Sequence, residues 1–471
     1  MSESNHVGAS EKVGILMNAM GDSNHVGFSE KVGISMNAGA VFVLESKGTW
    51  LHAAYHLTTS VAGPGIISLP FAFATLGWGP GAVALIVGAA VTFYGYNLLS
   101  RVLEESESRG RRHLRYRELA ADILGRHWST FFITPLQFSV CLGATVFSAL
   151  LCGQSLKGMY SAVNPTGGLK LYHFIIFVSI VIMIFSQMPS FHSLRYFTFI
   201  SSLLALIYSL CIVCGSVIAG HSTHAPTKNY SLSGYSSADK LFNAFNGLSV
   251  IATAYGTSII PEIQATVAPP VGYKMYKALL LCYAVVLSTF FPVAISGYWA
   301  FGNQAVGNVF QNLSPNSGPS LVPNWLLFVA LISVTLQLLA IALVYAQPTF
   351  EVIEGRWSDV KSDKFSLRNV LPRVIMRSMF VAVGGVIAAM IPFFGDLNAL
   401  VGAVAFIPLD FILPFVLYNA MFKPSPKTLL FWIHASIIVV SLLVSVIGCI
   451  AAVRHIVQDA STYKLFANVS S

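Results

Sequence analysis

The sequence predicts an all-α integral membrane protein with eleven transmembrane helices. Hydrophobic residues make up 55% of the 471 residues and charged residues only 10%, whereas a soluble domain carries roughly 25% charged residues. The apolar residues gather in long segments near the 20 residues that a helix needs to cross a bilayer. Closed membrane barrels need short alternating strands instead, so these segments indicate helices.

The eleven predicted spans begin after a polar N-terminal segment. They cover residues 49–76, 80–103, 128–156, 171–187, 196–219, 241–264, 276–301, 323–347, 373–391, 396–420 and 428–453. With the N-terminus in the cytosol, the cytosolic segments hold 21 of the 27 Lys and Arg residues. This bias follows the positive-inside rule, and an odd number of spans places the C-terminus outside.

The chain divides into a cytosolic tail at 1–47, a transmembrane domain at 48–456 and a short extracytosolic tail at 457–471. The first tail is polar and repeats "SNHVGASEKVGILMN" (4–18) as "SNHVGFSEKVGISMN" (23–37), and two copies are too few for a solenoid. We expect it to be disordered. Three N-x-S sequons, at Asn229, Asn312 and Asn468, fall outside and predict glycosylation.

The net charge of +8 does not indicate a nucleic-acid partner. Basic runs such as "RGRRHLRYR" (109–117) lie in predicted cytosolic loops, where they act as topology signals. We therefore expect membrane lipid, and not nucleic acid, as a partner of this protein.

Two spans contain residues that interrupt a helix. The first span carries "TSVAGPGIISLP" (59–70), and the sixth carries "YGTSIIPEIQAT" (255–266). Interruptions at matching positions, five spans apart, are the sequence sign of a transporter built from two inverted five-helix repeats. The simpler alternative for each interruption is a proline kink.

The interruption in the first span predicts a binding site. Pro64 has no N–H and blocks the preceding helix, while Gly63 and Gly65 permit backbone angles that other residues resist. Free N–H groups at the start of a half-helix attract an anion, and freed carbonyls opposite attract a cation. A zwitterion with a carboxylate and an ammonium group fits both ends.

Ionisable residues inside membrane spans are costly and usually functional. His56 lies one turn before the first interruption, Glu262 one turn after the second, and Asp410 in the middle of "FIPLDFILP" (406–414). We predict that these three carry protons; the alternative is that they join helices by hydrogen bonds. Gln137 and Gln337 are expected to be packing features.

These stretches resemble the plant amino acid/auxin permease family, and most closely its GABA-transporter subgroup. The resemblance covers residues 38–471. The matching segments are "AGAVFVLESKGTWLHAAYHLTTSVAGPGIISLPFAF" (38–73), "PSFHSLRY" (189–196), "IIPEIQAT" (259–266), "SGYWAFGN" (296–303), "PFFGDLNALVGA" (392–403), "FIPLDFILP" (406–414) and "DASTYKLFA" (459–467).

The resemblance implies the amino acid–polyamine–organocation fold and inward amino-acid movement coupled to protons. By position, the substrate would contact eight residues at the two interruptions. These are Ala62, Gly63, Pro64, Gly65, Tyr255, Gly256, Thr257 and Ser258. "GPG" (63–65) resembles the Gly-Ser-Gly of the wider amino-acid permeases, which leaves the substrate open between GABA and α-amino acids. Span 5 lacks the lysine that some proton-coupled relatives of the fold place there, so the residues leave proton and sodium coupling open.

The expected function is therefore import of GABA and related small amino acids by proton symport. A broader neutral amino-acid carrier or an auxin-type carrier is the alternative within the family, and a receptor or channel is the alternative outside it. We expect no enzyme activity, cofactor or metal site, since "HAAYH" (52–56) lacks a third ligand. The expected location is the plasma membrane, with the vacuolar membrane as the alternative, and the oligomeric state stays open.

Overall fold

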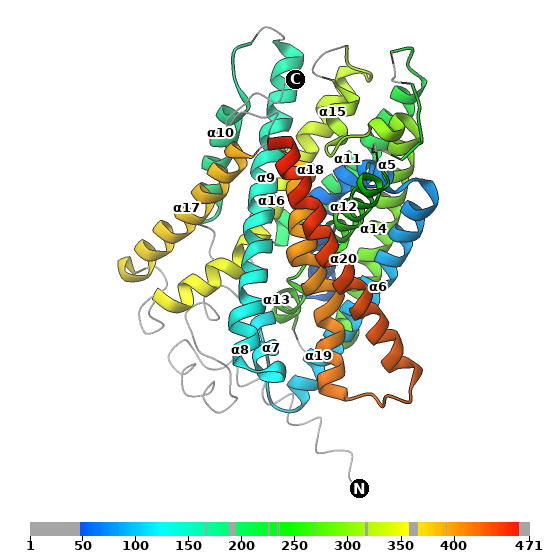
Figure 1. The fold of residues 1–471 in the computed structure, drawn as a ribbon. Coiled ribbons are helices and arrows are strands. Elements are labelled where there is room, and N and C mark those ends of the chain that lie inside the picture. The colour runs from blue at the N-terminus through cyan, green and yellow to red at the C-terminus, as the bar shows by residue number, and fades with distance from the viewer. Residues whose placement is uncertain are drawn as a thin grey trace.

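The computed structural model describes residues 48–460 apart from 165–166, 188–194, 225–226, 233, 235, 269, 316–318, 358–365 and 392. Figure 1 shows long helices that run roughly along one axis and pack into a single bundle. Within the described residues, the β-structure is one isolated bridge between Gly48 and Val267. The prediction of an all-helical protein is confirmed.

The helices follow the predicted spans closely. In chain order they are α4 (Trp50–Val61), the 3₁₀-helix η1 (Pro64–Ser68), α5 (Leu69–Leu76), α6 (Trp78–Ser108), α7 (Tyr116–Leu124), α8 (Arg126–Trp128), the π-helix η2 (Ser129–Ile133), α9 (Thr134–Val163), α10 (Leu171–Phe185), α11 (Arg195–His221), α12 (Ser237–Tyr255), α13 (Ile260–Ala265), α14 (Gly272–Phe301), the 3₁₀-helix η4 (Gly302–Gln304), α15 (Val309–Leu313), α16 (Asn324–Trp357), α17 (Leu367–Met390), α18 (Phe394–Val401), the π-helix η5 (Gly402–Ile412), α19 (Leu413–Phe422) and α20 (Leu429–Ala460).

Within the described residues, nine helical runs are long and apolar enough to cross a membrane. The other two predicted spans differ from these nine for identifiable reasons. Helix α10 has only 15 residues, or about 23 Å, against a hydrocarbon core of about 30 Å. The sixth span is divided into α12 and α13 and begins with polar residues.

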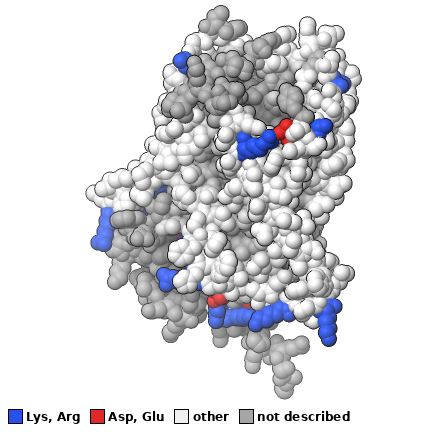
Figure 2. Space-filling view, viewed as in Figure 1, with Lys and Arg blue, Asp and Glu red and all other residues white. Residues whose placement is uncertain are grey.

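The first span forms the centre of the bundle, and the last lies at its edge. In the most apolar window of Trp50–Leu76, 94% of residues are buried, against 22% in Leu429–Gln458. Among these nine runs, the first, interrupted span is the one most buried within the bundle. Figure 2 shows a row of Lys and Arg along the lower edge, near α7 and α19, and further Lys and Arg near the upper end, with a largely uncharged surface between them on the right-hand side.

Hydrogen bonds tie the two interrupted spans together at the end of the bundle that contains α13. The Gly48 N–H donates to Thr266 O (2.8 Å), and the Ala268 N–H donates to Gly48 O (2.9 Å). The start of the first span is therefore fixed to the segment that follows α13.

Buried ion pairs stabilise the same end of the bundle. Glu351 of α16 pairs with Arg115, and with Arg117 at 3.3 Å. One turn later Glu354 contacts Arg377 through a hydrogen bond of 2.9 Å. All these groups except Arg117 are nearly inaccessible to solvent, so removing one partner would leave an uncompensated buried charge.

The predicted tails meet the described region only at its C-terminal edge. Helix α20 continues to Ala460, four residues into the segment assigned to the short C-terminal tail. The N-terminal repeat at 1–47 and residues 461–471 lie outside the described residues.

Candidate functional site

The first span is interrupted where the sequence predicts it, but the break is shorter than the motif. Helix α4 ends at Val61, and η1 begins at Pro64. The break is thus residues 62–63, while Pro64 and Gly65 form the first turn of the next helix. Proline suits that position because its missing N–H would have no helical partner there. All four residues are buried.

The two interrupted helices touch at Gly65. A Cβ atom added to Gly65 would lie 2.5 Å from Ala254 Cα and 2.9 Å from Ala254 Cβ. Because one of these atoms belongs to the backbone of α12, no rotation of a side chain can relieve the contact. Glycine at 65 therefore allows α12 to approach η1 directly, and this places the two breaks beside each other.

We expect Gly65→Ala to reduce uptake by at least about fivefold, because displacing packed backbone costs roughly 1–3 kcal/mol and 1.4 kcal/mol is a factor of ten. The measurement is substrate uptake, normalised to protein in the membrane. Gly79→Ala is the control, since a Cβ there meets no atom within 4 Å. Equal uptake by the two variants would contradict the role of the Gly65 contact.

The second break is residues 256–259, between α12 and α13. Ser258 has a backbone φ of +53°, in the left-handed region that side chains other than Gly, Asn and Asp rarely adopt. Such a conformation costs of order 1–3 kcal/mol and persists only when its surroundings impose it. Hydrogen bonds to Ser258 from two sides supply that constraint.

Asp410 holds Ser258 from one side. Its Oδ1 accepts from the Ser258 N–H (2.8 Å), and its Oδ2 accepts from Ser258 Oγ (2.6 Å). The Tyr96 hydroxyl donates to Asp410 Oδ1 (3.1 Å) and to Tyr255 O (2.9 Å), just before the break. Asp410 lies in the π-helix η5, and π-helical segments often mark functional sites.

Glu262 lies on the other side of the second break, in α13. Its Oε1 accepts from Gln137 Nε2 (2.7 Å) and from the Tyr116 N–H (3.0 Å). Its Oε2 has no hydrogen-bond partner within the described part of the chain. The carboxyl group is only 1% exposed, so one oxygen is fixed and the other can hold a proton.

Two routes of hydrogen bonds link the Glu262 and Asp410 carboxylates, one through Gln137 and Ser258 and one through Tyr116 and Leu409. We call the residues of both routes the polar ring. On one side, Gln137 Nε2 donates to Ser258 O (3.2 Å) as well as to Glu262. On the other, the Tyr116 hydroxyl donates to Leu409 O (2.7 Å), next to Asp410. The polar ring consists of Gln137, Ser258, Asp410, Leu409, Tyr116 and Glu262. A change in the charge of Glu262 therefore acts directly on groups that fix the second break.

The carbonyl groups near the first break also accept hydrogen bonds from side chains. Gln337 Nε2 donates to Ala62 O (2.6 Å), and the Tyr345 hydroxyl donates to Ser60 O (3.0 Å). Both donors come from α16. The interrupted backbone is thus satisfied by its neighbours, as a membrane interior requires.

The structure places the eight predicted substrate contacts at the two adjacent breaks, and Glu262 and Asp410 in the polar ring. His56 is buried in α4 and is not a member of this ring. Gln137 and Gln337, which the sequence analysis treated as packing features, also bond to the breaks. An isolated amide in an apolar span is the signal that could have identified them.

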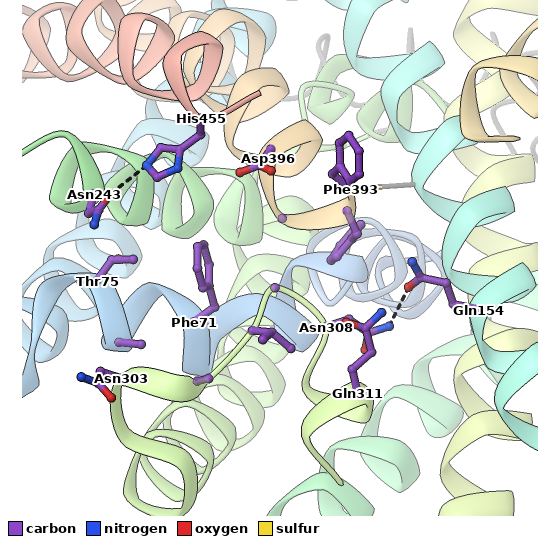
Figure 3. A pocket seen from close by; sticks show the side chains of 16 residues that line it. Phe71, Thr75, Gln154, Asn243, Asn303, Asn308, Gln311, Phe393, Asp396 and His455 are labelled. Carbon is purple, nitrogen blue, oxygen red and sulfur yellow. Dashed lines mark hydrogen bonds between the residues drawn. The ribbon is translucent and has the colours of Figure 1, made fainter. Parts of the chain in front are cut away.

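A cavity of about 380 Å³, which we call the outer cavity because it lies on the predicted outer side, is at the end of the bundle opposite α7, near the C-terminal end of the first span. Figure 3 shows Asn243 and His455 on one side of it and Gln154 and Asn308 on the other, each pair joined by a hydrogen bond. Asp396 also lines it. Most of the lining polar groups are neutral amides, which suits a small polar solute.

A close backbone contact separates the outer cavity from the breaks. A Cβ added to Gly307 would lie 2.8 Å from Gly395 Cα, and Ser68 Oγ, in η1, donates to Gly307 O (2.8 Å). The residues of both breaks are buried. In this conformation the breaks are therefore closed to water, while the cavity above them is open.

The sequons differ in their surroundings. Asn229 is exposed, and its Oδ1 accepts from the Ser231 N–H (2.9 Å). Asn312 accepts from the Val306 N–H (2.9 Å) and donates through Nδ2 to Gln304 O (2.9 Å). At Asn312, the side-chain nitrogen that would carry a glycan is thus already hydrogen-bonded within the loop. Asn468 lies outside the described residues.

Comparisons with known proteins agree with this architecture. The family model described as "Transmembrane amino acid transporter protein" matches residues 46–457. GABA transporter 1 of Arabidopsis thaliana is 49% identical over 433 residues, which cover 92% of this chain and 96% of the relative. Lysine histidine transporter-like 1 of Arabidopsis thaliana is 30% identical, covering 89% and 90% of the two chains.

The fold also resembles that of a solved symporter. A Na⁺-coupled sialic acid symporter, in a substrate-bound outward-open state, superposes with a TM-score of 0.50 at 11% identity. The alignment covers 93% of this chain and 95% of the symporter chain. At this level of identity the similarity concerns the fold alone.

Proposed function

This chain belongs to the transmembrane amino acid transporter family, and we propose that it imports GABA and related small amino acids by proton symport. The family is one of multi-pass membrane transporters rather than enzymes. The observation that carries the proposal is the pair of adjacent helix breaks, joined through the polar ring to two buried carboxylates. This arrangement combines a substrate site with groups that can hold protons.

The proposed architecture has eleven spans. It counts the nine long runs, the short α10 and the interrupted pair α12–α13 as membrane crossings. The two breaks, five spans apart, then correspond to each other in two inverted five-helix repeats. The basic end of the bundle faces the cytosol in this topology, and the plasma membrane is the proposed location.

The proposed substrate site lies between the two breaks. The substrate carboxylate faces Ala62, Gly63, Pro64 and Gly65, next to the start of η1. The opposite wall is Tyr255, Gly256, Thr257 and Ser258. The Tyr255 hydroxyl has no hydrogen-bond partner among the described residues and is fully buried, which supports a role in contacting a polar ligand.

The 49% identity to GABA transporter 1 supports GABA as the substrate. A broader neutral amino-acid or auxin-type carrier is the second candidate, supported by the "GPG" motif at 63–65 and by the 30% identity to a lysine histidine transporter-like protein. Either substrate would enter from the outer cavity. The Gly307–Gly395 contact, which is closed in this conformation, would open for entry and then close again behind the substrate.

Protons are the proposed coupling ions, and Glu262, Asp410 and His56 are the proposed carriers. Glu262 supports this best, because one of its oxygens is held by two donors while the other has no partner in the described region. Asp410 accepts three hydrogen bonds, so gaining a proton would weaken its hold on Ser258. Protonation of either carboxylate would therefore change the shape of the proposed substrate site.

The test is uptake and current in oocytes or transport-deficient yeast, with GABA, proline, alanine and auxin at pH 5.5 and 7.5. We expect GABA to give the largest uptake, with a higher rate at pH 5.5 because protons are co-transported. Absence of uptake and current with all four compounds would contradict the transporter proposal and favour a receptor. A larger response to proline or auxin would favour the second candidate.

A further inference from the structure

Three neighbouring carbonyl oxygens around the first break accept hydrogen bonds from side chains of other helices. Ser60 O accepts from Tyr345 and Ala62 O accepts from Gln337, both on α16. Gly63 O accepts a longer bond of 3.5 Å from the hydroxyl of Tyr208, on α11. Carbonyls freed by helix interruptions are the groups that bind coupling cations in transporters with broken helices. Here the same groups already have donors.

The shortest of these bonds has an unambiguous direction. A carbonyl oxygen can only accept, so the amide atom of Gln337 that lies 2.6 Å from Ala62 O must be the nitrogen. Gln337 is completely buried. A neutral amide therefore occupies one coordinating direction of Ala62 O and presents the positive ends of its N–H bonds at the break.

We propose that Gln337 determines the coupling ion, by supplying a fixed neutral donor in place of a sodium ion at the first break. This inference rests on the proposed function, because it concerns the ion that drives transport. Na⁺ is a hard cation that needs several oxygen ligands. The donors from Gln337 and Tyr345 occupy Ala62 O and Ser60 O, which leaves fewer carbonyl oxygens for a cation at the first break. The first break keeps its shape without a metal ion, and coupling is left to the carboxylates.

The change Gln337→Glu tests this assignment. A glutamate can maintain the bond to Ala62 O only when it is protonated, and when ionised it repels that oxygen. A sodium ion between the carboxylate and the carbonyl would relieve the repulsion. We expect wild-type GABA uptake to be equal in sodium chloride and choline chloride. At pH 7.5 in choline chloride, we expect the variant's uptake to be at least about tenfold lower than that of the wild type, equivalent to 1.4 kcal/mol. We expect the variant's uptake to increase when sodium is added.

Gln347→Glu is the matched control. Gln347 lies on the same helix and is also completely buried, but neither of its amide atoms has a hydrogen-bond partner in the described part of the chain. The control introduces the same charge at similar burial, at a side chain that makes no hydrogen bond to the described residues of the break. We expect its remaining uptake to show no response to sodium. A sodium response in this control, or none in Gln337→Glu, would overturn the proposal.

A second measurement does not depend on the variant folding or on transport. The thermal stability of the purified wild-type protein is compared in sodium chloride and choline chloride at equal ionic strength. A ligand that binds only the folded state raises the midpoint temperature, so we expect no difference between the salts. A sodium-dependent increase would overturn the proposal. Absence of wild-type GABA uptake would instead contradict the proposed function. The stability measurement would still show whether sodium binds, because it does not require transport.

Discussion

Replacing Glu262 by glutamine is expected to abolish the acid stimulation of uptake. The amide oxygen of a glutamine can still accept from Gln137 and the Tyr116 N–H, which both bond to Oε1 of Glu262. The side chain keeps its shape but can no longer gain or lose a proton. We expect the ratio of uptake at pH 5.5 to uptake at pH 7.5 to fall to about one, since the variant resembles the neutral acid in both conditions.

The control for this prediction is Glu105→Gln. Glu105 is a partly exposed carboxylate at the end of α6, and it pairs with Arg109 at 2.9 Å one turn away. Exposed pairs of this kind contribute about 0.3–0.5 kcal/mol. The control should keep the wild-type response to pH. An unchanged pH response in Glu262→Gln would return Glu262 to a structural role.

Replacing Asp410 by asparagine should have the largest effect on the site itself. Asp410 accepts from the Ser258 N–H, Ser258 Oγ and the Tyr96 hydroxyl. An asparagine has one acceptor oxygen; if this oxygen takes the place of Oδ1, the NH₂ group faces Ser258 Oγ, which can accept from it but loses the acceptor for its own hydroxyl proton. A buried donor without a partner costs about 1–3 kcal/mol. We expect uptake to fall by at least about tenfold and the midpoint temperature of the purified protein to decrease.

Ser258→Ala distinguishes this effect from a general loss of packing. It removes only the bond from Ser258 Oγ to Asp410 and leaves the backbone N–H bond in place. A single buried hydrogen bond contributes about 1 kcal/mol, so this variant should be less impaired than Asp410→Asn. The reverse order of severity would contradict the role of Asp410 in holding the second break.

The length and composition of the apolar segments predicted the helices well, because each span needs about 20 apolar residues to cross the same bilayer. The predicted span at 49–76 and the helical run Trp50–Leu76 differ by one residue at the start. The break at residues 62–63 was predicted because proline and glycine act locally on the backbone. The structure adds that Pro64 begins the second half-helix, so the break is shorter than the "GPG" motif.

The polar ring could not be predicted from the sequence, because it depends on which helices are neighbours. Gln137 and Glu262 are 125 residues apart in the chain and meet at 2.7 Å. The left-handed conformation of Ser258 is imposed by Asp410, 152 residues away. Nothing in "YGTSIIPEIQAT" (255–266) marks the serine for that conformation. The sequence identified the carboxylates as unusual, and the fold supplies their partners.

The most direct test of proton symport uses purified protein in liposomes with GABA at equal concentration on both sides. An inward proton gradient is imposed, with sodium absent, and the internal GABA concentration is followed with time. We predict accumulation above the external concentration, which disappears when a protonophore collapses the gradient. An internal GABA concentration that stays equal to the external one while the proton gradient is present would contradict the account.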